Sequence, residues 1–196
     1  MAAIDRQNDL WVRANRRISP RLLSDLLRFT GDATTAYFAQ VDGSALGSPV
    51  NWAGPDPAPV WFDLAREYTE RWVHQQHIRD AVRCPGMTEP RWMAPVLQTF
   101  AMALPHALRD VAVPSGTGVG LIITGDAGGV WWAVRNTDRW ELSETPPVVQ
   151  ATTVQIDQAS AWRRFTRGTS PDASEALVEG DQAIGQQVLQ MVTIIA

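Results

Sequence analysis

The chain has 196 residues and a formal net charge of −4, with 45% hydrophobic and 19% charged residues. This composition is that of a globular protein, and the length allows one large domain or two small ones. The acidic balance, without a basic stripe, argues against a nucleic-acid partner. No apolar stretch approaches the about 20 residues that span a membrane. Because Cys84 is the single cysteine and no signal-peptide segment is evident, we expect a cytoplasmic protein.

The first part of the sequence predicts helices. Residues 2–18 have a partly amphipathic pattern, and Ser19-Pro20 is a typical helix start, with Ser as the N-cap and Pro in the first turn. The helix that follows is expected to continue to Asp42-Gly43. Its strong apolar face consists of Leu22, Leu23, Leu26, Leu27 and Phe29. Residues 43–59 are rich in Gly and Pro and are expected to form a loop.

The sequence from Trp61 to Val82 contains no Gly or Pro and predicts a long helix. Apolar residues surround much of its circumference, which predicts burial. Its main apolar side is expected to contain Trp61, Leu64, Tyr68, Trp72 and Val82. By contrast, Glu70, His74 and His77 share one stripe at spacings i, i+4 and i+7. Such groups inside a mostly apolar helix need partners, so the stripe is a candidate metal site; a plain Glu–His hydrogen bond is the alternative.

The second part of the sequence changes character near Pro114. Before it, residues 92–108 predict a third strong helix that Pro95 and Pro105 trim or bend. After it come β-branched runs bounded by glycine, which predict an antiparallel sheet. Its strands are expected at residues 118–124, 130–134, 140–142 and 148–156. Two helices are expected after the strands, at residues 157–167 with Asp157 as cap and from Gly180-Asp181 to Val192. We therefore expect a helical domain over residues 1–110 and an α+β domain over residues 114–196.

The expected hairpin between the first two strands leads to a test. Trp131 and Trp132 are neighbours in a strand, so one of them must face the core. The loop from Gly125 to Gly129 is expected to tolerate substitution better than either tryptophan.

Other motifs give weaker signals of chemistry. Residues 115–120 contain GxGxG, but they precede a strand and lack the P-loop lysine, so nucleotide binding is not expected. Cys84 has no obvious base beside it that would make it a nucleophile. His106 is expected to pack or to face solvent. A cluster of arginines could meet a carboxylate substrate, although a solvated helix face is the simpler interpretation: Arg163, Arg164 and Arg167.

The residues around Glu70 and His74, Arg-Glu-Tyr-Thr-Glu-Arg-Trp-Val-His-Gln-Gln, resemble the metal-binding helix of the maleylpyruvate isomerase N-terminal family, within the DinB-like four-helix-bundle superfamily. Several pieces of the second half resemble the sterol-carrier-like C-terminal domain that often follows this bundle: Gly116-Thr117, Gly128-Gly129-Val130-Trp131, Trp140-Glu141-Leu142 and Glu179-Gly180-Asp181. The resemblance implies a partial bundle, lacking the first two helices, followed by a small α+β domain.

The resemblance also implies an activity. Family members use a divalent metal, zinc above all, to bind or activate a low-molecular-weight thiol that adds to an electrophilic small-molecule substrate in isomerase or S-transferase reactions. In actinobacteria, whose GC-rich genomes favour Arg over Lys as this chain does, the thiol would be mycothiol. Glu70 and His74 match family ligand positions, whereas His77 does not, and the first ligand histidine is missing. Two alternatives stay open: a metal-free binding module with a Trp-lined pocket for a small apolar molecule, and a fragment completed by another chain.

The missing helices also bear on assembly. They should leave an apolar side partly uncovered, formed by Leu22, Leu26, Phe29, Trp61 and Trp72. Exposed apolar patches of that size are rare on soluble monomers, and a symmetric dimer is the commonest remedy. We therefore expect a homodimer.

Overall fold

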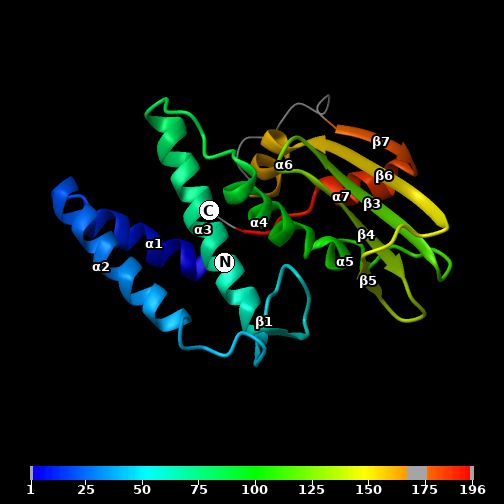
Figure 1. Cartoon of the computed structure of the whole chain (residues 1–196), viewed down its shortest axis with the longest axis horizontal. Coiled ribbons are helices and arrows are strands. Elements are labelled where there is room, and N and C mark those ends of the chain that lie inside the picture. Colours follow the sequence, from blue (N-terminus) through cyan, green and yellow to red (C-terminus); the bar gives the residue numbers. More distant parts are fainter. Residues whose placement is uncertain (1, 167–175, 195–196) are drawn as a thin grey trace. The chain divides into compact units, whose positions relative to one another are not determined.

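The computed structural model describes residues 2–166 and 176–194, and it is an α+β structure (Figure 1). Its contacts divide the chain into two compact units, Met1–Asp42 and Gly43–Ala196. The first unit is purely helical, and the second contains the sheet together with the remaining helices. Within the described ranges, no helix is long and apolar enough to cross a membrane.

The first unit consists of α1 (Ala2–Asn15) and α2 (Pro20–Phe38). As the sequence predicts, Ser19 caps α2: its Oγ accepts a hydrogen bond from the Leu22 amide at 3.3 Å. The second helix ends at Phe38, short of the expected Asp42-Gly43. None of the residues of α2 is buried, so its apolar face is open in this unit.

The second unit begins with a small sheet where the sequence predicts only a loop. Strands β1 (Leu46–Pro49) and β2 (Pro57–Pro59) pair in antiparallel fashion. Proline lacks the amide hydrogen that a longer ladder needs, which keeps both strands short.

The described part of the second unit contains five helices: α3 (Val60–Ala81), α4 (Pro90–Ala101), α5 (Leu104–Ala107), α6 (Gln158–Phe165) and α7 (Gln182–Leu189). Pro95 lies inside α4 without ending it, whereas the expected third helix divides before Pro105, which lies in the first turn of α5. The carboxylates of Asp157 and Asp181 cap α6 and α7, each accepting two backbone N–H bonds. These local predictions are confirmed.

The main sheet has five strands: β3 (Thr117–Thr124), β4 (Gly129–Arg135), β5 (Trp140–Ser143), β6 (Val149–Asp157) and β7 (Ala176–Gly180). Their order is β5-β4-β3-β6-β7. The expectation of an antiparallel sheet is wrong at one pairing, because β6 runs parallel to β3. After the β3–β4–β5 meander the chain crosses to the other side of β3, where β6 runs in the same direction as β3. The sequence analysis also missed β7.

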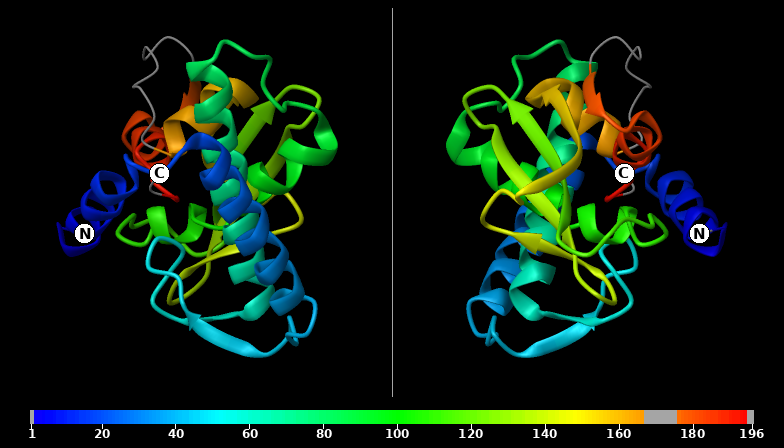
Figure 2. Two further views of the ribbon diagram at one scale, coloured as in Figure 1. Left: turned by 90° about the vertical axis from the view of Figure 1, so that its left-hand side faces the viewer. Right: turned by 90° about the vertical axis from the view of Figure 1, so that its right-hand side faces the viewer.

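The core of the second unit lies between the sheet and its helices (Figures 1 and 2). Val119, Leu121 and Ile123 point from the central strand into it and are at most 3% exposed. The same buried cluster contains residues of α3 and α4, among them Trp72 and Phe100. The change of composition near residue 114 therefore falls inside a continuous core, and the contacts place the division of the chain near residue 42 instead.

Helix α3 buries a side that coincides only in part with the expected one, since Trp72 is buried but other residues of the expected side are not. Phe62 and Val73 are 3% and 0% exposed, whereas Trp61 and Leu64 are 45% and 47% exposed. Because apolar residues surround this helix, its sequence does not define which side meets the core. Of the five residues expected to be partly uncovered, Trp72 is buried at 3% exposure, and the other four are exposed.

The β3–β4 hairpin confirms the alternation of the two tryptophans. Trp131 faces α4, where its Nε1 donates to Gln98 Oε1 at 2.8 Å. Trp132 points to the opposite face of the sheet, against Gly120. The expected tolerance of the loop is not supported, because a Cβ at Gly128 would lie 2.0 Å from the Ile123 carbonyl oxygen.

Candidate functional site

The stripe on α3 brings two of its three candidate ligands together. His74 Nε2 lies 3.5 Å from Glu70 Oε2, with side chains 59% and 38% exposed. The His77 ring centroid is 6.0 Å from that of His74 and 6.1 Å from that of Trp162 on α6. Desolvation raises the pKa of Glu70, an effect that His74 opposes, and desolvation lowers the pKa of His77.

This arrangement does not fit the expected zinc ion. Across residues 2–166 and 176–194, no group of three or more His, Cys, Asp or Glu side chains is placed to hold a metal. Glu70 and His74 alone supply two donors, whereas zinc in proteins takes three or four protein ligands. The pair is better described as a partly exposed Glu–His contact.

Other residues singled out in the sequence have structural contacts. Arg163 Nη2 meets Asp80 Oδ2 of α3 at 2.9 Å, and Arg164 Nε donates to the Leu189 carbonyl at 2.8 Å. Their helix face is therefore tied to its neighbours instead of being simply solvated, and Arg167 lies outside the described residues. Cys84 is exposed. Gly118 and Gly120 of the GxGxG motif lie inside β3, where Pro147 and Trp132 approach too closely for a Cβ.

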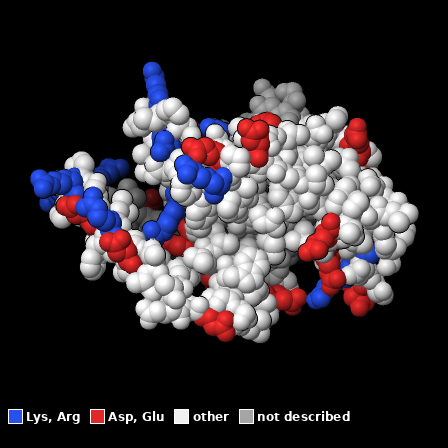
Figure 3. Space-filling model, in the orientation of Figure 1, with Lys and Arg blue, Asp and Glu red and all other residues white. Residues whose placement is uncertain are grey.

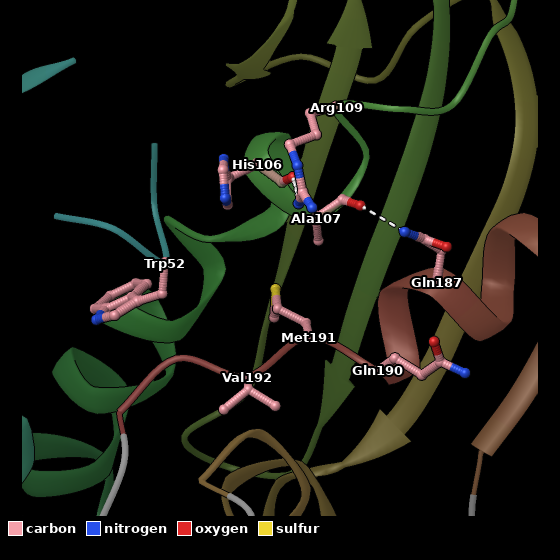
Figure 4. Close-up of a pocket in the computed structure, with 8 residues that line it drawn as sticks. All are labelled: Trp52, His106, Ala107, Arg109, Gln187, Gln190, Met191 and Val192. Atoms are coloured by element: carbon pink, nitrogen blue, oxygen red, sulfur yellow. Dashed lines mark hydrogen bonds between the residues drawn. The ribbon is translucent and has the colours of Figure 1, made fainter. Parts of the chain in front are cut away.

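A second and more enclosed site lies in the second unit, between α5, α7 and the loop after β1. This pocket has a volume of about 300 Å³. It is lined by Trp52, His106, Ala107, Arg109, Gln187, Gln190, Met191 and Val192 (Figure 4). Volumes of this order lie at the lower end of small-molecule sites. A smaller hollow of about 160 Å³ is lined mainly by apolar residues, including Trp61, Phe62 and Met102.

The pocket walls are fixed by contacts between distant parts of the chain. Gln187 Nε2 donates to the Ala107 carbonyl at 3.2 Å, which ties α7 to α5. The Trp52 ring packs edge-on against Phe62, with centroids 5.4 Å apart and planes at 70°. Met191 is 4% exposed and belongs to the core cluster. The pocket is thus supported by the core and not by loops alone.

The pocket carries positive charge and no acid in its lining. Arg109 Nη1 donates to the His106 carbonyl at 2.9 Å, and Arg109 Nε lies 3.4 Å from Oδ2 of Asp110, which is not a lining residue. Desolvation lowers the pKa of His106, Arg109 lowers it further and Asp110 opposes the change. The imidazole is therefore neutral near pH 7, able to donate from one nitrogen and accept at the other. In the view of Figure 3, the half of the surface that contains the sheet is largely uncharged, with a few acidic and basic side chains.

Sequence reasoning missed this pocket. It treated His106 as a packed or exposed residue and did not single out Arg109 or Gln187. The walls come from distant parts of the chain; the contact between the Ala107 carbonyl and Gln187, for example, joins residues 80 positions apart. No pattern in the local sequence predicts such a contact. The clue that was available was a loop tryptophan, Trp52, among turn residues, since aromatic side chains in loops often line sites.

Comparisons with known proteins add little to this geometry. No family model matches the chain, and no curated protein matches it; neither comparison supports the resemblance to the maleylpyruvate isomerase family. A solved structure with partial likeness is the sterol carrier protein domain 2 of Helicoverpa armigera. It is 11% identical with a TM-score of 0.26, over 50% of this chain and 78% of that one. Likeness at this level establishes neither a shared fold nor a shared function.

Proposed function

We propose that the chain is a small-molecule-binding module whose ligand occupies the pocket beside Trp52. The observation that carries this proposal is the supported hollow of about 300 Å³, in which polar side chains converge beside a smaller apolar surface. A hollow of this size with a few placed polar groups is large enough to hold a small molecule. Met191 and Val192 supply apolar surface, while His106 and Arg109 supply donors.

The chemistry of the lining favours binding over catalysis. The described lining contains no Ser, Thr, Cys, Asp, Glu or Lys side chain, so it offers neither a nucleophile nor a carboxylate base. His106 is the one titratable imidazole there, and it has no carboxylate partner in the lining to orient it. A histidine without a carboxylate partner, next to an arginine, is better suited to binding polar groups of a ligand than to general acid–base catalysis.

A metal-dependent, thiol-using isomerase or S-transferase is the second candidate. Its support is the approach of Glu70 and His74 on one flank of α3. It would need at least one more ligand from outside the described residues or from another chain, because the described donors do not complete a zinc site. The binding module needs no such addition, so we favour it.

We also propose that the chain acts as a homodimer. The support is the set of exposed apolar residues on two helices: Leu22, Leu26 and Phe29 are 57%, 46% and 71% exposed on α2, and Trp61 is 45% exposed on α3. Burying large apolar and aromatic side chains of this kind is the usual source of dimer stability.

The binding function is tested by nuclear magnetic resonance with ¹⁵N-labelled protein and a set of neutral, anionic and cationic one- and two-ring compounds. We expect at least one compound to shift the amide signals of Ala107, Gln187 and Val192 together. Val192→Trp should fill the pocket and abolish the shifts. The matched control is Val130→Trp, at an exposed strand position outside the lining, and it should bind as the parent does. Absence of any concerted shift, or unchanged binding by Val192→Trp, would overturn the proposal.

A further inference from the structure

Resting on the proposed function, we propose that the ligand of this pocket is an aromatic carboxylate, whose carboxylate meets Arg109 and whose ring lies against Trp52. Each half of this assignment depends on a different wall of the pocket. The wall with Trp52 and the wall with Arg109 lie on two sides of the pocket, and Met191 lies between them (Figure 4).

The carboxylate is assigned from the charge of the lining. Arg109 is the one fully charged side chain among the lining residues, and it is held in place by the bond from Nη1 to the His106 carbonyl. Its nearest acid, Asp110, lies outside the lining with its side chain 76% exposed, and it approaches only to 3.4 Å. Exposed ion pairs of this kind are weak, so an entering carboxylate can replace Asp110. The planar guanidinium fork matches a carboxylate in geometry as well as in charge.

The ring is assigned from the apolar walls. Trp52 is half-buried, and its edge-on contact with Phe62, which is 3% exposed, holds the indole in one orientation. An aromatic ligand gains from an offset or edge-on contact with such a fixed ring and loses little freedom in making it. Met191 offers a polarisable sulfur that also favours aromatic neighbours. An aliphatic acid of the same charge would use neither feature.

The remaining lining limits the size and the charge of the ligand. At about 30 Å³ for each water, the volume of about 300 Å³ corresponds to about ten waters, which suits an acid with one or two rings. Gln187 and Gln190 add amide groups that tolerate neutral polar substituents. A cationic ligand would lie beside Arg109 with no acid in the lining to offset the repulsion.

The experiment compares three probes of one shape: 2-naphthoate, 2-naphthamide and 2-naphthylmethylammonium, titrated by calorimetry and by ¹⁵N nuclear magnetic resonance. We expect 2-naphthoate to bind about tenfold or more tightly than the amide, as befits one charged hydrogen-bonded contact. The ammonium compound should bind most weakly. Added salt should reduce the advantage of the acid over the amide, because the contact is partly exposed.

Three variants at two positions assign the contacts, and a fourth serves as control. Arg109→Gln should weaken the acid more than the amide and so remove the preference for the acid, and Arg109→Lys should retain part of this preference. Arg71→Gln is the matched control: Arg71 is 49% exposed against 53% for Arg109, and it likewise pairs with a nearby acid, but it is not in the lining. This control should bind as the parent does. Trp52→Leu should weaken the acid and the amide alike.

The outcomes separate the two proposals. Equal affinity for acid and amide, with signals shifting at Ala107 and Val192, would overturn the carboxylate assignment and leave the binding function intact. Retention of the preference in folded Arg109→Gln would overturn it too. Unchanged affinities in Trp52→Leu would overturn the ring contact. No binding of any aromatic compound at this pocket would remove the proposed function along with the inference.

Discussion

Gly128 in the β3–β4 hairpin allows a direct test of the fold, because alanine at this position should be far more disruptive than a loop residue suggests. A Cβ there would lie 2.0 Å from the Ile123 carbonyl oxygen and 2.8 Å from its carbon. Gly128 is not among the residues with positive φ, so the effect is one of space and not of backbone preference. The contact is with backbone atoms, which cannot rotate away as a side chain can. The hairpin must therefore open by about 1 Å to reach an ordinary contact.

The cost follows from the bonds that this opening breaks. The Gly128 amide donates to the Gly125 carbonyl at 2.9 Å, and the Ala127 amide donates to Gln158 Oε1 at 2.9 Å. Loss of each costs about 1 kcal/mol, and residual overpacking adds about 1–3 kcal/mol. The sum is about 3–5 kcal/mol, which corresponds to a fall in Tm of about 6–20 °C for a chain of this size.

The assay is thermal and urea unfolding of Gly128→Ala beside a matched glycine. Gly116→Ala is that control: its φ is +86° with no atom within 4 Å of the new Cβ, so it should lose only the about 1–2 kcal/mol of a left-handed alanine. If Gly128→Ala were no less stable than Gly116→Ala, the close approach at the hairpin would be refuted.

Three further predictions concern the metal, the assembly and pH. Elemental analysis of untagged protein dialysed without chelator should find well under one zinc per chain, since Glu70 and His74 offer two donors; a full equivalent would show that further ligands exist. Light scattering at micromolar concentration should give a dimer mass, and Leu26→Glu should shift it toward the monomer; a monomeric parent would contradict the dimer. Burial lowers the pKa of His77 and of His106 in the folded state, so the unfolded chain binds more protons below about pH 6.5. The urea midpoint should therefore fall as pH drops from 7.5 to 5.5, and it should fall less in His106→Gln. If the midpoint of His106→Gln fell with pH as steeply as that of the parent, the result would count against a lowered pKa of His106.

Elements whose causes are local were predictable from the sequence. Ser19 and Asp157 cap their helices because a side-chain oxygen two or three positions away satisfies free amides, a pattern that sequence alone displays. The span of α3 follows from an uninterrupted run between Pro59 and the Cys84-Pro85-Gly86 turn. The β3–β4 hairpin follows from glycines between β-branched runs. None of these requires knowledge of a partner element.

Features that depend on distant partners were not predictable. The parallel pairing of β6 with β3 depends on which side of the meander the returning chain takes, and both sides offered a free strand edge. The buried side of α3 depends on where α4 lies. The pocket depends on long-range contacts such as the bond from Gln187 to the Ala107 carbonyl. In each case the local sequence is compatible with several arrangements, and the packing of the whole chain selects one of them.

The stripe on α3 shows why a helical spacing is insufficient for a metal site. Spacing of four residues places Glu70 and His74 side by side, but a closed coordination sphere needs donors from a second element. The element that faces this flank is α6, and it presents the Trp162 ring near His77 and the Arg163 guanidinium, which is bound to Asp80. Desolvation is the main cause of the lowered pKa of His77, and the opposing effects of Asp80 and Arg163 follow it. The facing helix thus supplies an aromatic ring and an arginine that is already paired, neither of which is a metal ligand.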